Sequence, residues 1–285
     1  MGIFSDILLT VDFDRTLTAP DSTIPQRNME AIRYFIENGG AFTVNTGRSV
    51  PMCTHNVIPF VPVNAPLLLY NGSAAYDVHT KKLTRFSPIE LDAAAFLSDL
   101  QARFPQLPLE IQGVDAHYLL KANPMWERFS ENNNCNWDYA TPDAIPQPFI
   151  KVSFYGEMRQ ATVADMYEAT PEELQLFAQI EDYVRENYGD KVDVFRACAR
   201  IVDIHAKGVS KLRSARFLQQ ELGKKLLVCI GDAPNDIPML DGADYAYCPA
   251  DGMIADRYET VCDCAKGAVA DVIYEKIPAI LQNEP

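Results

Sequence analysis

The stretch "DILLTVDFDRT", residues 6–16, places two aspartates directly after a short apolar run rich in strand-forming residues. Such a run is typical of a buried parallel strand. Alternate residues of a strand point to the same face, so Asp12 and Asp14 are expected about 7 Å apart at their Cα atoms. Two unpaired carboxylates at that spacing raise each other's pKa and destabilise the fold. A hard divalent cation bound through oxygen ligands would remove the conflict.

The segments that follow predict an α/β core. "QRNMEAIRYFIENGG" (26–40) has an apolar face at helical spacing and ends at two glycines, which indicates a helix. "AFTVNTG" (41–47) is typical of a second buried strand, and "APLLLYNGSAAYD" (65–77) of a third strand with a hairpin arm that turns at Asn71-Gly72. Strand, helix and strand in this order predict a parallel sheet with right-handed crossovers.

The middle of the chain has a different character. Between residues 86 and 200, short strands separated by single helices indicate an inserted α+β domain. One long helix is expected from Thr170-Pro171, whereas the Asn- and Pro-rich residues 132–148 are expected to be irregular. The α/β pattern resumes with the helix "SKLRSARFLQQELG" (210–223) and the strand "KLLVCIGD" (225–232). We therefore expect a Rossmann-like core of residues 1–85 and 201–285, with residues 86–200 as an inserted α+β cap.

Composition limits the partners and the location. The 285 residues carry a formal net charge of −14, so no basic surplus exists to bind nucleic acid or an anionic membrane. The 7 cysteines form no CxxC pair, and their odd number fits a reducing compartment. The N-terminal apolar run lacks the features of a signal peptide, and no run approaches membrane-spanning length. We expect a cytoplasmic protein that is a monomer or a weak homodimer.

Polar residues follow several of the predicted strands. In a parallel sheet, functional side chains gather outside the carboxyl ends of the strands. Asp12, Asp14, Thr46 and Asp232 all occupy such ends, and the segment "KGVSK" (207–211) adds cationic side chains. Carboxylates, Mg²⁺ and a lysine suit phosphoryl transfer, in which catalysis is mostly positioning and charge neutralisation.

Four motifs occur in a fixed order: "DFDRT" (12–16), "TGR" (46–48), "KGVSK" (207–211) and "GDAPNDIPML" (231–240). In this order, and with a large insert between the second and third, the sequence resembles haloacid dehalogenase-superfamily phosphatases of the Cof type. The resemblance covers residues 3–85 and 201–285, and the cap is matched only in position and coarse pattern. It implies a Mg²⁺-dependent phosphatase of small phosphorylated metabolites, sugar phosphates above all, whose cap selects the substrate.

The resemblance also implies roles for single residues. Asp12 would attack phosphorus and form an aspartyl-phosphate, and Asp14 would protonate the leaving oxygen and then activate water. Lys211 would neutralise the phosphate and the nucleophile, with Lys207 as the alternative lysine. For the phosphoryl group, the resemblance implies contacts from Thr46, Gly47 and Asn235. For Mg²⁺ it implies Asp12, Asp232 and the backbone carbonyl of Asp14 as ligands. Arg48 and Asp236 would be supporting residues of this site.

Three positions depart from the family pattern. Arg15 and Leu212 stand where glycine is common, and Pro234 is unusual within the last motif. We expect the Arg15 side chain to point away from the phosphate. Two other functions remain open from the sequence: a phosphosugar mutase that uses the same nucleophile, and a phospho-ligand-binding protein without turnover.

Overall fold

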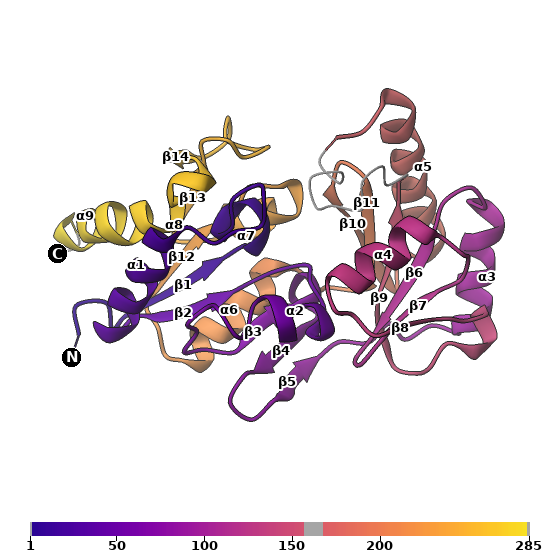
Figure 1. Cartoon of the computed structure of the whole chain (residues 1–285), viewed down its shortest axis with the longest axis horizontal. Helices are drawn as coiled ribbons and strands as arrows, with labels where there is room; N and C mark the ends of the chain where they lie inside the picture. The colour runs from indigo at the N-terminus through magenta and orange to yellow at the C-terminus, as the bar shows by residue number, and fades with distance from the viewer. Residues whose placement is uncertain (1, 157–167, 284–285) are drawn as a thin grey trace. The chain divides into compact units, whose positions relative to one another are not determined.

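The structure is a computed structural model that describes residues 2–156 and 168–283 (Figure 1). The chain divides into two compact units. The first consists of Met1–Gly47, Phe60–Thr84 and Ser210–Pro285, and the second of Arg48–Pro59 and Arg85–Val209. The insert expected at residues 86–200 falls within the longer segment of the second unit. Residues 48–59 join that unit too, which the sequence did not indicate.

The first unit is built on a five-stranded sheet in the order β14-β13-β12-β1-β2. All four of its strand pairs are parallel. Its strands are β1 Ile7–Val11, β2 Ala41–Val44, β12 Leu226–Ile230, β13 Tyr245–Pro249 and β14 Glu259–Val261. The unit's helices are α1 Gln26–Glu37, α6 Lys211–Glu221, α7 Ile237–Asp241, α8 Ala268–Asp271 and α9 Ile277–Asn283.

Helices cover the sheet of the first unit on both faces, which explains why its central strands β1 and β12 are apolar except for Thr10 (Figure 1). On one face, Leu8 and Leu227 of the sheet pack against Ala215 and Leu218 of α6. On the other, α1 lies beside α8, where the amide of Ala270 donates to the Asn28 side chain. This packing leaves the carboxyl ends of β1, β2 and β12 as the place where polar loops meet.

A small second sheet has the order β3-β4-β5, with β3 Leu67–Leu69, β4 Ala74–Asp77 and β5 Lys82–Phe86. It belongs to the first unit except for the last two residues of β5. Strands β3 and β4 are the strand and the hairpin arm expected at 65–77, and they pair antiparallel. A parallel bridge between Asn45 and Leu68 connects β3 with the end of β2. That bridge brings the turn after β3 close to the loop that follows β2.

The second unit contains a six-stranded sheet in the order β10-β11-β9-β6-β7-β8. Its strands are β6 Leu109–Gly113, β7 His117–Leu119, β8 Trp137–Tyr139, β9 Phe149–Tyr155, β10 Val192–Cys198 and β11 Ile201–Ala206. Its helices are α2 Val50–Asn56, α3 Ala93–Arg103, α4 Pro124–Asn132 and α5 Pro171–Tyr188. Only β7 and β8 pair in parallel among the pairs described here. Strand β8 lies in the passage expected to be irregular, so that prediction was wrong there.

The sheet of the second unit has two different faces. On one face, α3 and α5 bury an apolar core with Phe154, Phe177 and Ile204. Helix α5 begins as predicted, because Thr170 and Glu173 cap each other's backbone amides and Pro171 occupies the first turn. On the other face, α4 packs through Trp126 against Tyr155 of β9. In residues 2–156 and 168–283, no helix is both long and apolar enough to cross a membrane.

Candidate active site

Asp12 follows directly on the last residue of β1. Its backbone amide donates to the carbonyl of Ile230 at 3.0 Å, which fixes it beside the end of β12, and its side chain is buried. The strand was expected to continue to Asp14, but β1 ends at Val11, and residues 13–17 form a turn in which Asp14 and Arg15 have non-helical backbone angles. Within that turn Arg15 has a φ of 58°, in the left-handed region that favours glycine. This explains why glycine is usual at the position, while the direction of the Arg15 side chain stays a prediction.

Lys211 is the cation that meets Asp12. It is the first residue of α6, its side chain is fully buried, and its Nζ donates to Oδ1 of Asp12 at 2.6 Å and to Oδ1 of Asp236 at 2.7 Å. Lys207 is exposed, and its Nζ pairs with Asp193 of the second unit at 2.7 Å. Of the two candidate lysines, the structure thus brings Lys211 to Asp12.

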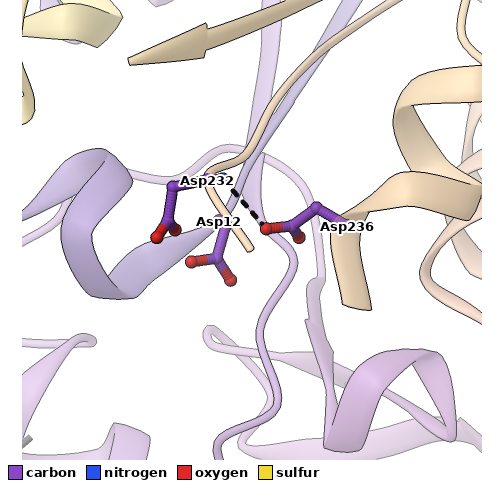
Figure 2. A group of neighbouring side chains, drawn as sticks. All are labelled: Asp12, Asp232 and Asp236. Carbon is purple, nitrogen blue, oxygen red and sulfur yellow. Dashed lines mark hydrogen bonds between the residues drawn. The ribbon is translucent and has the colours of Figure 1, made fainter. Parts of the chain in front are cut away.

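Asp236 organises the loop after β12. While its Oδ1 accepts from Lys211, its Oδ2 accepts from the backbone amides of Asp232 and Ala233 at 3.0 and 3.1 Å (Figure 2). Both oxygens of this carboxylate therefore hold protein groups. The contacts suit a residue that positions Lys211 and the Asp232 backbone.

Asp232 has a different set of contacts. Its side chain is fully buried, and its Oδ1 accepts from the Thr16 hydroxyl at 3.0 Å. Its Oδ2 has no hydrogen-bond partner among the residues that the structure describes. Carboxylate oxygens of Asp12, Asp232 and Asp236 lie within 4.8 Å of one another (Figure 2). A buried, unpartnered carboxylate oxygen beside other carboxylates fits a hard cation with oxygen ligands, such as Mg²⁺.

The electrostatics of the site indicate an excess of negative charge. Burial, with the charges of Asp236 and Asp14, raises the pKa of Asp12 to about 7 although Lys211 lowers it. Burial and the neighbouring carboxylates also raise the pKa of Asp232 well above its usual value. Burial disfavours the charged form of Lys211, but Asp12 and Asp236 outweigh it and raise its pKa. One lysine does not balance these carboxylates, which again fits a divalent cation.

Thr46 and Gly47 lie in the loop that follows β2, against the turn between β3 and β4. Thr46 is buried, its amide donates to the carbonyl of Leu68, and its carbonyl accepts from the amide of Asn71, each at 2.9 Å. A Cβ atom on Gly47 would lie 2.9 Å from Oδ1 of Asn71, so glycine lets the two loops approach. The same Oδ1 accepts from the Asn235 side chain at 3.1 Å. Asn71 thus links the loop of Thr46 to the loop of Asn235.

From the sequence, Asn71-Gly72 could either line the site or turn a hairpin, and the turn was favoured. The φ of 55° at Asn71 forms that turn, and its contacts also place it beside the predicted site residues, so both descriptions hold. The neighbouring Gly72 has a φ of 95°, and a Cβ there would lie 2.3 Å from the carbonyl oxygen of Ser210, at the start of α6. Asn45 was missed: its Nδ2 donates to the carbonyl of Lys211 at 2.9 Å.

Arg48 and the alternative lysine Lys207 are the predicted site residues that the division of the chain assigns to the second unit. The Arg48 side chain is buried, and its Nη1 donates to Oδ1 of Asn133 at 3.3 Å.

Comparison with known proteins gives consistent relatives. The sequence family described as haloacid dehalogenase-like hydrolase matches residues 9–255. The pyridoxal phosphate phosphatase YbhA of Escherichia coli is 22% identical over 284 residues, which cover 95% of this chain and 98% of that protein.

Solved structures show the same fold. The protein SMU.1108c of Streptococcus mutans aligns with a TM-score of 0.78 at 18% identity, over 95% of this chain and 98% of that one. The subclass IIB sugar phosphatase BT4131 aligns with a TM-score of 0.74 at 17% identity, over 96% and 99% of the two chains. At these identities the structural likeness shows the fold alone.

Proposed function

This chain belongs to the haloacid dehalogenase-like hydrolases, and on that basis we propose that it is a Mg²⁺-dependent phosphatase acting through a phosphate ester on Asp12. The observation that carries the proposal is the buried network in which Lys211 joins Asp12 to Asp236 beside Asp232. A nucleophile, a shared cation and an oxygen-rich metal site are the parts that phosphoryl transfer requires.

In the first step, a carboxylate oxygen of Asp12 attacks phosphorus and the bond from phosphorus to the substrate's alcohol oxygen breaks. Asp14, in its acid form, gives its proton to that leaving oxygen. Lys211, hydrogen-bonded to Asp12 at 2.6 Å, orients the nucleophile and offsets the charge on the transferring group. Thr46, Gly47 and Asn235 would bind the equatorial oxygens.

In the second step, the Asp14 carboxylate takes a proton from a water molecule, whose oxygen attacks phosphorus. The bond between phosphorus and Asp12 breaks, so phosphate leaves and both aspartates return to their starting forms. Splitting the reaction in this way replaces one very slow hydrolysis by two easier steps. Asp14 suits the proton-transfer role because it is half-buried and close enough to Asp12 to raise that residue's pKa.

Asp12 and Asp232, with the backbone carbonyl of Asp14, would hold Mg²⁺. The unpartnered Oδ2 of Asp232 supports this assignment, whereas both oxygens of Asp236 already accept protein hydrogen bonds. The bound ion would neutralise charge on the phosphoryl group and on the two carboxylates.

We propose small phosphorylated metabolites as the substrates, sugar phosphates above all. The support is that one relative is named for pyridoxal phosphate and one structural neighbour is a sugar phosphatase. The net charge of −14 supports a small substrate over a nucleic acid. We assign substrate selection to the second unit, because the residues proposed for the chemistry belong to the first.

The test is Asp12→Asn, assayed for phosphate release from a panel of sugar phosphates and pyridoxal phosphate with and without Mg²⁺. Turnover should fall by roughly 10³-fold or more, because the amide is a poor nucleophile of nearly the same shape. Asp6→Asn is the matched control: its carboxylate forms an exposed ion pair with Lys225 at 2.8 Å and should not affect turnover. Full activity of Asp12→Asn would refute the mechanism.

The same assay separates the two other functions. A mutase would return the phosphoryl group to the sugar and would depend on a bisphosphate activator, so free phosphate would not accumulate. A binding protein would bind the phosphorylated ligand without any phosphate release from the unaltered chain.

A further inference from the structure

A chain of buried polar side chains lies in the second unit. It begins at Ser49, one residue after the point where the polypeptide enters that unit. The Oγ of Ser49 and Nε2 of His117 are 2.7 Å apart. Nδ1 of His117 lies 2.7 Å from Oε1 of Glu110. Serine, histidine and carboxylate follow one another as in a hydrolytic triad, but Ser49 and Glu110 are 0% exposed and His117 is 1% exposed. Because the serine is sealed from solvent, a role in positioning fits better than one as a nucleophile.

Glu110 is the fixed end of this chain. Its Oε2 accepts from the Tyr155 hydroxyl at 2.6 Å and from Nε2 of Gln112 at 2.7 Å, and its Oε1 accepts from the Trp126 indole at 3.1 Å. Burial would raise the pKa of Glu110, but the contacts with His117, Tyr155 and Gln112 lower it below the usual value. The carboxylate therefore stays ionised and is held from several directions.

The His117 ring connects this carboxylate to Ser49. Its Nδ1 faces Oε1 of Glu110 at 2.7 Å, and Nε2, on the other side of the ring, meets the Ser49 hydroxyl at 2.7 Å. The Oγ of Ser49 in turn accepts from the backbone amide of Met52 at 3.3 Å and so caps α2. The orientation of Glu110 is thereby passed on to the first turn of α2.

Ser49 and the start of α2 follow the proposed phosphate-binding residues Thr46 and Gly47 closely in the sequence. The chain passes from the first unit to the second between Gly47 and Arg48, and Ser49 is the third residue after Thr46. Consecutive Cα atoms are about 3.8 Å apart, so a shift of Ser49 is passed along a short covalent segment to Thr46. Two further contacts hold the same segment, since Arg48 and Asn56 both donate to Oδ1 of Asn133 at 3.3 Å.

We propose that Ser49, His117 and Glu110 form a positioning relay that anchors the entry segment and so holds Thr46 and Gly47 in place for phosphoryl transfer. The catalytic half of this inference rests on the proposed phosphatase function. Phosphoryl transfer depends on the placement of hydrogen-bond donors, and a displacement of about 1 Å can cost on the order of 10²-fold in rate.

Two substitutions of His117 separate the two halves of the relay. In His117→Gln the side-chain amide reaches the position of Nε2, so contact with Ser49 is kept and contact with Glu110 is lost. In His117→Asn the amide takes the place of Nδ1, so Glu110 keeps its partner and Ser49 loses it. A relay that acts through Ser49 predicts that His117→Asn lowers kcat/KM about tenfold or more, mainly through kcat, and that His117→Gln loses less.

Hydrogen exchange gives a readout that needs no turnover. Amides of residues 46–53 should exchange about tenfold faster in His117→Asn than in the unaltered chain, and less so in His117→Gln. A purely structural histidine predicts the opposite order, because His117→Gln leaves the buried Glu110 without one of its donors.

Ser49→Ala should reproduce the effects of His117→Asn, and the double variant should add little to either, because both break the same contact. Ser130→Ala is the matched control: Ser130 is a buried serine of the second unit whose Oγ has no partner among the described residues. It should leave exchange at 46–53 and kcat/KM unchanged. Labelling of Ser49 by a fluorophosphonate would overturn the proposal, since it would show a reactive and accessible serine.

The two failures can be told apart. If the unaltered chain releases no phosphate from any substrate, the proposed function fails, and the exchange rates still test the anchoring. If His117→Asn leaves both exchange and kcat/KM of an active enzyme unchanged, the relay is refuted while the phosphatase stands.

Discussion

Replacing Asp232 by asparagine should stabilise the protein without metal and abolish its response to Mg²⁺. The substitution keeps an acceptor for the Thr16 hydroxyl, and it puts a donor where Oδ2 now lacks a partner among the described side chains. It also removes one charge from a group of carboxylates whose oxygens lie within 4.8 Å of one another. The variant therefore separates the role of Asp232 in stability from its role in metal binding.

The magnitude follows from the geometry. Two full charges within 4.8 Å repel by about 3.5 kcal/mol at an effective dielectric constant of about 20. Lys211 offsets part of this repulsion, and Asp12, with a pKa raised to about 7 mainly by burial, is only partly ionised at neutral pH. We therefore expect Asp232→Asn to raise the free energy of unfolding without metal by about 1–2 kcal/mol, or Tm by about 2–6 °C.

Mg²⁺ should reverse the order of stability. A ligand present at about 100 times its Kd stabilises the folded protein by about 2.7 kcal/mol, and only the unaltered chain would gain this. The assay is thermal unfolding of both proteins in EDTA and in saturating Mg²⁺. A lower Tm of Asp232→Asn in EDTA would refute the account of charge repulsion. An undiminished rise of its Tm with Mg²⁺ would refute the metal site.

Asp203→Asn is the matched control for that experiment. Asp203 is also buried, but it accepts from the Ser153 hydroxyl at 2.6 Å and from Nζ of Lys151 at 3.3 Å. Loss of its charge would leave Lys151 as a buried cation without its carboxylate, which is destabilising. Its Tm should therefore fall by a similar amount with and without Mg²⁺.

Two further predictions concern residues with positive φ. Arg15→Gly should change the free energy of unfolding by less than about 1 kcal/mol, because relief of left-handed strain is offset by a more flexible unfolded chain. A tenfold loss of kcat/KM in this variant would contradict the expectation that the Arg15 side chain points away from the phosphate. Asn71→Gly keeps the turn but removes the acceptor for Asn235, so it should lower phosphate release about tenfold with little change in Tm. Asn71→Ala should lower both, since alanine adds strain at a φ of 55°. Full activity of Asn71→Gly would leave this residue as a turn former only.

The family and the α/β fold class were predicted from the sequence and are confirmed. The prediction succeeded because strands buried on both faces leave continuous apolar runs, as in β1 and β12, and because helices at this size carry clear start and stop signals. Strand β8 was missed because its three residues are too few for a period to appear and lie among turn-forming residues. The hairpin of β3 and β4 was predicted, but an apolar run does not reveal that β3 belongs to a separate three-stranded sheet.

The candidate site was predictable in its motifs and not in its supporting contacts. Asp12 and Asp232, which are proposed to take part in the chemistry, lie at the ends of apolar runs, so their position on the chain indicates them. Asn45, Asn71 and Thr16 act through partners far away in sequence, as in the hydrogen bond from Thr16 to Asp232, which are 216 positions apart. Ser49 and His117 are likewise 68 positions apart. Such contacts arise only when the loops of the fold are brought together, so the spacing of residues along the sequence does not indicate them.

The use of a single lysine explains how the proposed site would both favour the ionised form of its nucleophile and bind metal. Lys211 touches Asp12 and Asp236 but is not seen to donate to Asp232 among the described contacts. A second buried lysine at Asp232 would relieve the repulsion, but it would also remove the oxygen that a cation needs. The repulsion among the carboxylates remains in the metal-free fold. Mg²⁺ would remove this repulsion when it binds, and the free energy so released would favour binding. On this view the lower stability of the metal-free protein and its affinity for the ion have the same physical cause.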